Sequence, residues 1–467
     1  MKILRRGAIA LVLLLLAVAL YLWLAPPGLL RVGANYSAKI VCSNVFLAGR
    51  DADEVLRVDV QAPGISLLRA MRVSVDLEHG VVRAGFLGFI GHGLAVARPG
   101  MGCTVLPDGN LESLGAAPGT AQPSAADLVA AHLSAAETSA PDTSAAPAQA
   151  PPGVDSASMA PILADDKLAG PGMRALLVID HGRIVGERYA PGFTAATPLL
   201  GWSMTKTVVA GLIGMLVKDG KLSLDQSGFW PQVPGDGRDK IRLADLLAMS
   251  SGLRFNEEYG AVSDVTSMLY LQPDMAGFAM GQPLAHPVGT VWSYSSGTAV
   301  ILSHIMQDAA GDGRAFVKER LFKPLGMRSA VIESDEHGTL VGSSYMYATA
   351  RDWGKYAQFL LQDGVWRGQE LLPSGYVAMM ASPVAASQGE YGHGQVWLWG
   401  SEAATPGVNP DAAFGIPGDT FWMSGHDGQS IAVVRSRQLA VVRLGLTPYS
   451  DGYSPQPLLK AVLGAIR

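Results

Sequence analysis

The chain contains few cysteines and few charged side chains for its length. Of its 467 residues, 2 are cysteine and 16% are charged, with a formal net charge of −5. The charges form no basic stripe, which argues against a nucleic-acid-binding protein. The 9 histidines are scattered without metal-ligand spacing, and no internal repeat is present. We therefore expect no metal, no cofactor and no nucleic-acid partner.

The composition instead favours a large protein with many loops. Apolar residues make up 49% of the chain, which is enough to fill a sizeable core. The 55 glycines and 29 prolines indicate loops rather than a helical bundle. A chain of this length predicts two or three domains.

Residues 1–25 have the pattern of a membrane anchor. Lys2, Arg5 and Arg6 precede an uncharged apolar run over residues 7–25, and about 20 such residues span a bilayer core. We expect an uncleaved single-pass helix in the inner membrane, with its basic flank in the cytoplasm and the rest of the chain in the periplasm. The alternatives are a cleaved signal peptide, which usually has a shorter apolar region, and a buried core helix.

Both cysteines follow this segment. Because an exported segment lies in an oxidising compartment, Cys42 and Cys103 are predicted to form a disulfide. Two free buried thiols are the alternative. The pair lies in a small exported region, residues 33–112, in which the pattern of 71–77 and 81–86 predicts a β-hairpin.

The composition divides the chain into four parts. One stretch is rich in Ala, Pro and Ser and lacks the bulky apolar residues that would offset the entropy of ordering, so we expect a flexible linker. The predicted parts are an anchor or signal segment 1–32, the exported region 33–112, the linker 113–158 and a large domain 159–467. In the large domain, the patterns predict strands over 175–179, 184–189, 430–434 and 440–444 and helices over 205–218 and 243–249.

Candidate catalytic residues lie in the large domain. Ser203 and Lys206 are three apart at the start of a predicted helix, so their side chains share one face. A serine hydroxyl needs a base to become a nucleophile, and a buried lysine that loses its proton can serve. Tyr294 is a candidate general acid, and Ser296 is a candidate proton relay or substrate-binding group.

Three motifs in a fixed order carry a resemblance to a known family. They are Ser203-x-x-Lys206, Tyr294-x-Ser296 and the stretch from Gly425 to Gln429. Together they resemble the serine β-lactamase-like superfamily, which includes class C β-lactamases, D,D-peptidases, esterases and 6-aminohexanoate-dimer hydrolases. Supporting stretches similar to the family's lie at residues 246–253 and 287–290.

The resemblance covers about residues 170–460 and implies a fold and a mechanism. The implied fold is α/β (α+β), with an antiparallel sheet flanked by helices, a helical subdomain and a serine at their boundary. The implied mechanism is an acyl-enzyme with Ser203 as nucleophile. By the same resemblance, His426, Gly428 and Gln429 form the third motif, and Gln429 supplies the second oxyanion amide.

Two departures from class C β-lactamases point to another branch of the superfamily. Ser296 stands where those enzymes have asparagine, and His426 stands where they have the lysine of K-T-G. Histidine is neutral for much of the time at pH 7. These departures resemble the amidase and esterase branch, especially the 6-aminohexanoate-dimer hydrolases.

Each candidate residue also has a purely structural interpretation. Ser203 could be an ordinary helix N-cap with Lys206 on a solvated face, Tyr294 a core aromatic and His426 a turn residue. Further side chains that could line the pocket or only fill space are Tyr259, Asp264 and Trp397, and the stretch Ser343, Ser344 and Tyr345 is expected to pack a loop.

The sequence therefore predicts a membrane-anchored serine hydrolase. Its substrate would be a small amide, ester or peptide-like molecule, cleaved through an acyl-serine without a metal. One rival hypothesis is a penicillin-recognising β-lactamase or D,D-peptidase. Another is an inactive member of the family that serves as an envelope scaffold.

Overall fold

The computed structural model describes residues 2–62, 65–114, 134, 156–232, 235–401 and 405–466. The chain divides into two compact units. One comprises Met1–Leu128 together with Glu258–Pro273, and the other comprises Val129–Glu257 together with Asp274–Arg467. We call them the N-terminal unit and the C-terminal unit and describe each by itself. The predicted linker falls mainly outside the described residues and stays a prediction.

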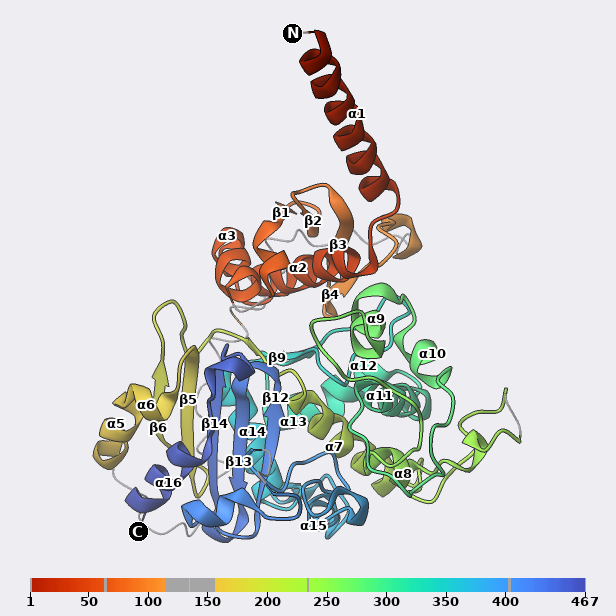
Figure 1. The fold of residues 1–467 in the computed structure, drawn as a ribbon. Helices are drawn as coiled ribbons and strands as arrows, with labels where there is room; N and C mark the ends of the chain where they lie inside the picture. The colour runs from red at the N-terminus through yellow and green to blue at the C-terminus, as the bar shows by residue number, and fades with distance from the viewer. Residues whose placement is uncertain are drawn as a thin grey trace. The chain divides into compact units, whose positions relative to one another are not determined.

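Helix α1, Lys2–Leu24, is apolar and exposed along its length (Figure 1). Its stretch Ile3–Leu24 is long and apolar enough to cross a membrane, and none of it is buried against the rest of the chain. A signal sequence near an N-terminus has the same properties. The helix is therefore either a membrane span or a signal, and the anchor stays a prediction.

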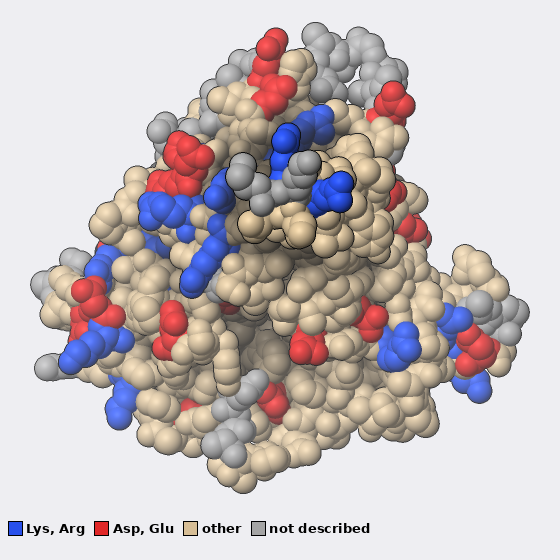
Figure 2. Space-filling view, turned by 45° about the horizontal axis from the view of Figure 1, so that its top comes forward, with Lys and Arg blue, Asp and Glu red and all other residues tan. Residues whose placement is uncertain are grey.

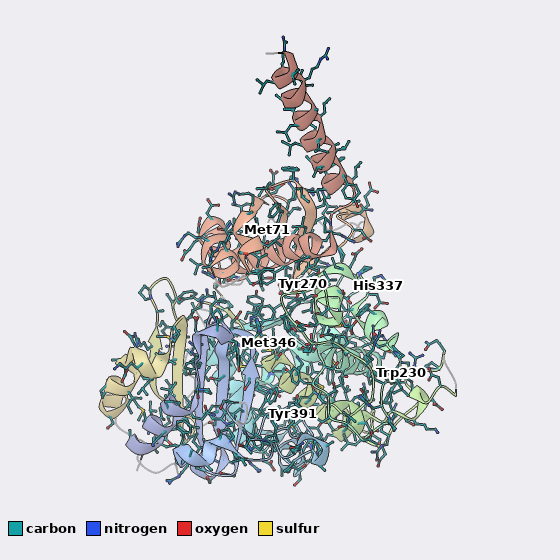
Figure 3. The ribbon with its side chains drawn as sticks, in the orientation of Figure 1. Met71, Trp230, Tyr270, His337, Met346 and Tyr391 are labelled. Atoms are coloured by element: carbon teal, nitrogen blue, oxygen red, sulfur yellow. A yellow bond between two sulfur atoms is a disulfide. The ribbon has the colours of Figure 1, made fainter. Side chains whose placement is uncertain are left out.

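The N-terminal unit is built on helix α2, Gly28–Phe46, which packs against a four-stranded antiparallel sheet. The approach is close, because a Cβ at Gly33 would lie 2.6 Å from the Cε of Met71, which is labelled in Figure 3. The predicted hairpin is confirmed, with Met71 paired to Phe86 and Asp76 to Val81. The strands, in sheet order, are β1 Met71–Asp76, β2 Val81–Phe86, β3 Ile90–Arg98 and β4 Gly102–Val105.

A disulfide ties this helix to the sheet. Cys42 of α2 is bonded to Cys103 of β4, with the two Cα atoms 6.0 Å apart, and both side chains are fully buried. The sequence patterns did not predict α2. The helix and the edge strand are joined covalently, so the small core of this unit does not depend on apolar burial alone.

The C-terminal unit contains a five-stranded sheet in the order β12-β13-β14-β5-β6, antiparallel throughout (Figure 1). The four strands predicted from the sequence are all present. The bounds are β5 Met173–Asp180, β6 Arg183–Tyr189, β12 Thr420–Gly425, β13 Gln429–Val434 and β14 Leu439–Gly445.

Helices cover both faces of this sheet. On one face, Gly354 of α14, Ala350–Leu361, approaches Leu177 and Ile179 of β5. On the other, Leu176 and Val178 join a core with α5, Ser156–Ala164, and α16, Gln456–Ala465. All eight residues of β5 are buried, which explains why its central residues 175–179 form a continuous apolar run rather than an alternating pattern.

A helical part completes this unit. Its central helix α7, Met204–Lys218, is buried from Met204 to Leu216 and packs against α11 and, at its start, against the edge strand β12. The predicted antiparallel sheet, flanking helices and helical subdomain are thus confirmed. The other helices here are α8 Leu243–Leu247, α10 Met275–Met280, α11 Ser296–Ala310, α12 Gly313–Val317 and α13 Lys323–Leu325.

The remaining elements are short. They are α3 Ala52–Val55, α6 Asp166–Ala169, α9 Asp264–Leu271, α15 Tyr376–Met380, β7 Leu199–Leu200, β8 Val331–Ile332, β9 Met346–Ala348, β10 Val365–Trp366 and β11 Gln369–Glu370. On the face drawn in Figure 2, acidic and basic side chains are interspersed among a majority of uncharged ones. That surface agrees with the low charged fraction of the sequence.

Candidate active site

Ser203 lies at the N-terminus of α7, directly after a strained residue. Trp202 is buried with φ +48°, a conformation that is costly for a bulky side chain. Its carbonyl accepts hydrogen bonds from the amide of Thr205, at 3.0 Å, and from the Thr205 hydroxyl, at 2.7 Å. In the part of the chain that the structure describes, the Ser203 amide has no backbone acceptor, so the start of α7 leaves a donor beside the Ser203 hydroxyl.

Lys206 lies one turn into the same helix and is almost fully buried. Its Nζ is 2.9 Å from Ser203 Oγ, 3.2 Å from Ser296 Oγ and 2.9 Å from the carbonyl oxygen of Ser343. Burial lowers the pKa of Lys206 to about 8, although the negative charge of Glu257 opposes that shift. A measurable fraction of the amine is therefore neutral near pH 7 and able to accept a proton from Ser203.

Tyr294 contacts both Ser203 and Lys206. Its hydroxyl is hydrogen-bonded to Ser203, and Lys206 Nζ lies 4.8 Å from the centre of its ring. Burial, together with the charge of Glu257, raises the pKa of Tyr294. The phenol therefore keeps its proton at neutral pH, which suits a group that donates a proton rather than one that accepts it.

Aromatic side chains form a wall around Tyr294. Its ring centre lies 5.1 Å from that of Trp397 and 5.9 Å from that of Tyr391, and Trp292 packs on both of these neighbours. Tyr391, labelled in Figure 3, is fully buried, whereas Trp292 and Trp397 are partly exposed. Trp397 therefore lies beside a predicted site residue.

Glu257 was not predicted from the sequence. Its carboxylate accepts hydrogen bonds from the Ser296 amide, at 2.8 Å, and from the Ser296 hydroxyl, at 2.5 Å. The contacts therefore run from Ser203 to Lys206, from Lys206 to Ser296 and from Ser296 to Glu257. Glu257 lies in a loop, where no helical or strand spacing relates it to the motifs. No sequence signal marked it; in the fold, a Cβ at Gly297 would lie 2.5 Å from the ring of Phe255, so the glycine lets this loop approach the start of α11 closely.

The third motif forms the turn between β12 and β13. A Cβ at Gly425 would lie 2.3 Å from the carbonyl oxygen of Gly201, so the end of β12 closely approaches the segment that precedes Ser203. The His426 ring packs edge-on against Trp202, with centres 5.6 Å apart, and its Nε2 is 3.4 Å from a carboxylate oxygen of Asp427. The His426 side chain is 43% exposed, in contrast to Lys206.

The side chain of Gln429 braces this turn. Its Nε2 donates to the carbonyls of His426, at 3.1 Å, and Gly445, at 2.7 Å, and its Oε1 accepts from the Gly445 amide. The buried guanidinium of Arg443 donates to the carbonyl of Gly428 at 2.8 Å. With its side chain used in this way, Gln429 can act on a substrate only through its backbone amide.

The structure therefore brings Ser203, Lys206, Tyr294 and Ser296 into one cluster, and His426 packs on Trp202, the residue before Ser203. Tyr259 and Asp264 instead belong to the N-terminal unit. The stretch Ser343 to Tyr345, which was expected only to pack a loop, contributes the carbonyl of Ser343 to Lys206. The buried hydroxyls of Ser343 and Ser344 are hydrogen-bonded to each other at 2.9 Å.

The family is decided by a match to the beta-lactamase family model over residues 163–459, more than half of the chain. The chain belongs to the beta-lactamase family. All seven predicted residues of the three motifs lie in the matched range. The resemblance stated from those motifs is confirmed, and the chain is a member of a hydrolase family.

Individual relatives are distant. A 6-aminohexanoate-dimer hydrolase from Paenarthrobacter ureafaciens is 23% identical over 278 residues, which cover 53% of this chain and 69% of the relative. A solved penicillin-binding protein homologue from Caulobacter crescentus matches with TM-score 0.51 and 17% identity, over 67% of this chain and 99% of that chain. A family VIII carboxylesterase matches with TM-score 0.50 and 16% identity, over 66% of this chain and 97% of that chain. These structures share the fold.

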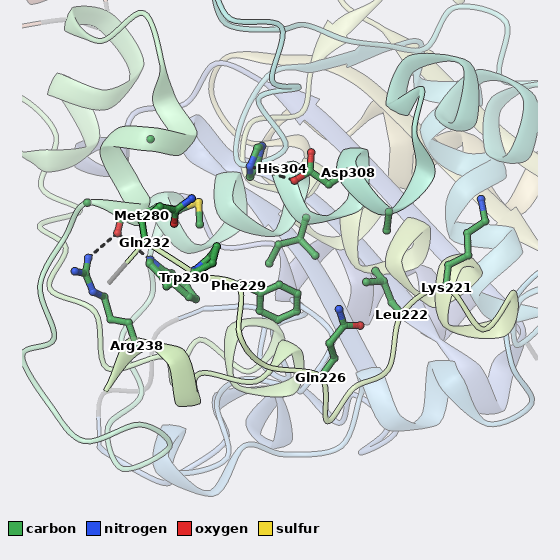
Figure 4. Close-up of a pocket in the computed structure, with 15 residues that line it drawn as sticks. Lys221, Leu222, Gln226, Phe229, Trp230, Gln232, Arg238, Met280, His304 and Asp308 are labelled. Carbon is green, nitrogen blue, oxygen red and sulfur yellow. Dashed lines mark hydrogen bonds and ion pairs between the residues drawn. The ribbon is translucent and has the colours of Figure 1, made fainter. Parts of the chain in front are cut away.

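Two further features bear on other kinds of site. Among the described residues, no group of His, Cys, Asp and Glu side chains is arranged to hold a metal ion. A pocket of about 680 Å³ lies in the helical part, between the loop with Phe229 and Trp230 and the helix face with His304 and Asp308 (Figure 4). No predicted site residue lines it, so it is separate from the candidate active site.

Proposed function

We propose that this protein is a serine hydrolase that cleaves an amide or ester bond through an acyl intermediate on Ser203. The observation that carries the proposal is the 2.9 Å contact between Ser203 Oγ and the Nζ of Lys206, a buried amine whose pKa is lowered to about 8. A serine beside an amine that can lose its proton is an activated nucleophile. An envelope scaffold would have no need for this buried amine.

In the proposed reaction, neutral Lys206 takes the proton of Ser203 while Ser203 Oγ attacks the substrate carbonyl. The amides of Ser203 and Gln429 stabilise the oxyanion. Tyr294 donates a proton to the leaving amine or alcohol as the scissile bond breaks, and net transfer from Lys206 restores the phenol. A water molecule then attacks the acyl-serine and gives a proton to the same groups, which return a proton to Ser203 Oγ as the acyl–oxygen bond breaks and the acid product leaves.

The surroundings of the site favour uncharged or apolar substrates. The wall of Trp292, Tyr294 and Trp397 supplies apolar contact, and the negative charge of Glu257 disfavours a nearby carboxylate. His426 stands where a penicillin-recognising enzyme would carry a permanent positive charge. A simple ester or a neutral amide therefore fits better than a β-lactam.

We further propose that α1 anchors the protein in the inner membrane and that both units face the periplasm. The exposed apolar surface of α1 and the Cys42–Cys103 disulfide support this, because disulfides persist in oxidising compartments. The full chain should sediment with membranes, and a chain that begins at Pro26 should be soluble. A full-length product trimmed near residue 25 and found in solution would instead identify a cleaved signal.

A substrate screen on the full chain in detergent tests the activity. We expect turnover of short-chain p-nitrophenyl esters or anilides and covalent labelling by a fluorophosphonate probe, with heat-denatured protein as the control. A fluorescent penicillin should label weakly or not at all. Strong penicillin labelling would favour the β-lactamase or D,D-peptidase alternative, and no labelling by either probe would favour a scaffold.

A further inference from the structure

The last turn of α1 carries two exposed aromatic side chains, Tyr21 and Trp23. Tyrosine and tryptophan are enriched at the interfaces of a bilayer, because each combines an apolar ring with a polar group. In the membrane-spanning arrangement proposed above, these two residues therefore mark the level at which the chain leaves the hydrocarbon on the periplasmic side.

The end of α1 is joined to the sheet of the N-terminal unit, and both belong to the same compact unit. Nε2 of His92 on β3 donates to the carbonyl of Trp23 at 2.9 Å, and the two rings meet edge to face with centres 5.7 Å apart. The last carbonyls of a helix have no partner within the helix, so this hydrogen bond satisfies one of them. The start of β3 is therefore held at the level of Trp23.

The turn between β2 and β3 lies close to this junction. Phe86 pairs with Ile90, so the turn consists of residues 87–89. Phe89 is three residues before His92, a separation of about 10 Å in an extended strand. In Figure 1, α1 rises on the side of the unit where β1 and β2 lie, and α2 lies on the other side. The turn is therefore near the level at which α1 leaves the bilayer.

Two apolar side chains are exposed in this turn. Leu87 is 55% exposed and Phe89 is 47% exposed. Leu87 has φ +53° and Gly88 has φ +90°, a backbone conformation that Gly, Asn and Asp adopt at lower cost than leucine. A polar residue at position 87 would suit both the backbone and water. An apolar residue that suits neither indicates that the turn contacts something other than water.

Two arginines lie beside the turn. A Cβ at Gly88 would lie 3.7 Å from the Cβ of Arg72 on β1, and the Leu87 amide donates to the carbonyl of Ala70, the residue after Arg69. Both arginines are exposed, and among the described residues neither forms an ion pair with a carboxylate. Exposed apolar residues beside cations match the interface of an anionic membrane, where acyl chains lie directly below charged headgroups.

The opposite end of the β1–β2 hairpin has a different character. Leu77 is exposed there too, but it lies between the exposed acidic residues Asp76 and Glu78. Because β1 is six residues long, this end lies about 20 Å from the β2–β3 turn. Negative charges disfavour contact with anionic headgroups, so only one end of the hairpin suits a membrane.

We propose that residues 87–89, together with Arg69 and Arg72, form a membrane-contact surface of the N-terminal unit, whose partner is the anionic phospholipid layer around α1. Leu87 and Phe89 enter the interface between headgroups and acyl chains, and the two arginines bind phosphate groups. The inference rests on the proposed anchoring by α1. It adds a second contact with the membrane, which fixes the orientation of the N-terminal unit relative to the bilayer.

The test places the fluorophore NBD on single cysteines of the full chain in vesicles. Phe89→Cys and Leu77→Cys carry the fluorophore at the two ends of the hairpin, and Leu13→Cys carries it in the middle of α1. The native cysteines are joined in the Cys42–Cys103 disulfide, so only the new thiol reacts. The vesicles contain phosphatidylcholine and phosphatidylglycerol in equal parts, with a spin-labelled lipid that quenches at headgroup depth or at acyl-chain depth.

Headgroup-labelled lipid should quench most of the fluorescence at position 89 and leave that at position 77 unchanged. Acyl-chain-labelled lipid should quench the fluorophore at position 13. If position 13 is quenched but position 89 is not, or if positions 77 and 89 are quenched equally, the proposal is overturned. An unquenched fluorophore at position 13 would instead overturn the proposed anchoring, so the two failures are distinguishable.

Leu87→Asn separates a membrane contact from a structural role. Asparagine tolerates positive φ and removes the apolar side chain, so the midpoint of thermal unfolding should stay level or rise. Quenching at position 89 should fall by about half, because one of the two apolar side chains of the turn is lost. Leu77→Asn is the matched control and should leave that quenching unchanged. Unchanged quenching in Leu87→Asn would remove Leu87 from the membrane-contact surface and overturn the proposal.

The double variant Arg69→Gln, Arg72→Gln tests the role of lipid charge. With both arginines present, quenching at position 89 should be weaker in vesicles of phosphatidylcholine alone than in the mixed vesicles, and the double variant should lose this dependence. Arg83→Gln, at an exposed position in the middle of β2, is the control and should keep it. The same dependence in the double variant would overturn the assignment of the arginines to phosphate groups.

Discussion

The two ends of the candidate site are held in different ways. At the nucleophile end, Lys206 is almost fully buried and its ammonium group contacts two hydroxyls and a carbonyl. At the third-motif end, His426 is 43% exposed, and the turn is held through its backbone by Gln429 and Arg443. We therefore propose that the chemistry depends on the first end, whereas the second end selects the substrate.

The largest effect should come from the nucleophile. Ser203→Ala should abolish probe labelling and hydrolysis and leave the fold intact, because no side-chain cap is lost at this helix start. Ser436→Ala, in an exposed turn between β13 and β14, is the control. Thermal melting and turnover measured on the same preparations check the prediction, and full turnover in Ser203→Ala would remove this residue from the mechanism.

Lys206→Ala should lower turnover by about 10²–10⁴-fold, as expected for a general base, with a smaller change in KM. The amine acts in proton transfer and is too deeply buried to bind much substrate. Lys218→Ala is the control, because Lys218 lies in the last turn of the same helix and its side chain is partly exposed. A variant with normal kcat and raised KM would assign Lys206 to binding instead.

The pH dependence should report the buried amine. Because the pKa of Lys206 is lowered to about 8 and only the neutral form accepts a proton, kcat/KM should rise with pH and level off above about 8. Below that value it should fall about tenfold per pH unit, as for one required deprotonation. If kcat/KM instead fell near pH 6, and His426→Gln removed that fall, the base would lie at the third-motif end rather than at the nucleophile end.

His426→Lys should have the smallest effect on the chemistry and a clear effect on selectivity. A permanent charge at this turn should improve binding of carboxylate-bearing substrates such as penicillins by about 1–3 kcal/mol, the value of a hydrogen bond to a charged group. Hydrolysis of neutral esters should stay level or fall.

Ser436→Lys adds the same charge at the turn between β13 and β14 and serves as the control for His426→Lys. Inhibition constants for a penicillin, measured against ester hydrolysis, check the prediction. Equal effects of the two variants would show that His426 lies outside the binding region.

Regular patterns explain what could be predicted from the sequence. Residues 175–179 of β5 are a continuous apolar run, β14 is interrupted only by Arg443, and both strands are buried in the sheet. In α7 the apolar residues Val208, Leu212 and Met215 have helical spacing, and the helix is buried from Met204 to Leu216. The cluster of Ser203, Lys206, Tyr294 and Ser296 could be assembled because its three motifs occur in a fixed order. Their catalytic roles remain predictions that the experiments above test.

The features that were missed lack such patterns. Helix α2 buries Asn35, Ser37, Lys39 and Asn44, which interrupt the apolar period that marks a helix, and these polar groups find partners only in the folded chain. Glu257 lies in a loop, where position depends on packing rather than on spacing. The attachment of Glu258–Pro273 to the N-terminal unit joins residues more than two hundred positions apart, such as Asn35 and Tyr270.

The most direct test of the account is to trap the acyl intermediate. The full chain is mixed with p-nitrophenyl acetate, quenched in acid during steady-state turnover, digested and analysed by mass spectrometry. The account predicts an acetyl group on the peptide that contains Ser203, which disappears when the ester is exhausted before the quench. Steady hydrolysis with no acetylated Ser203, or with the acetyl group on another residue, would contradict it.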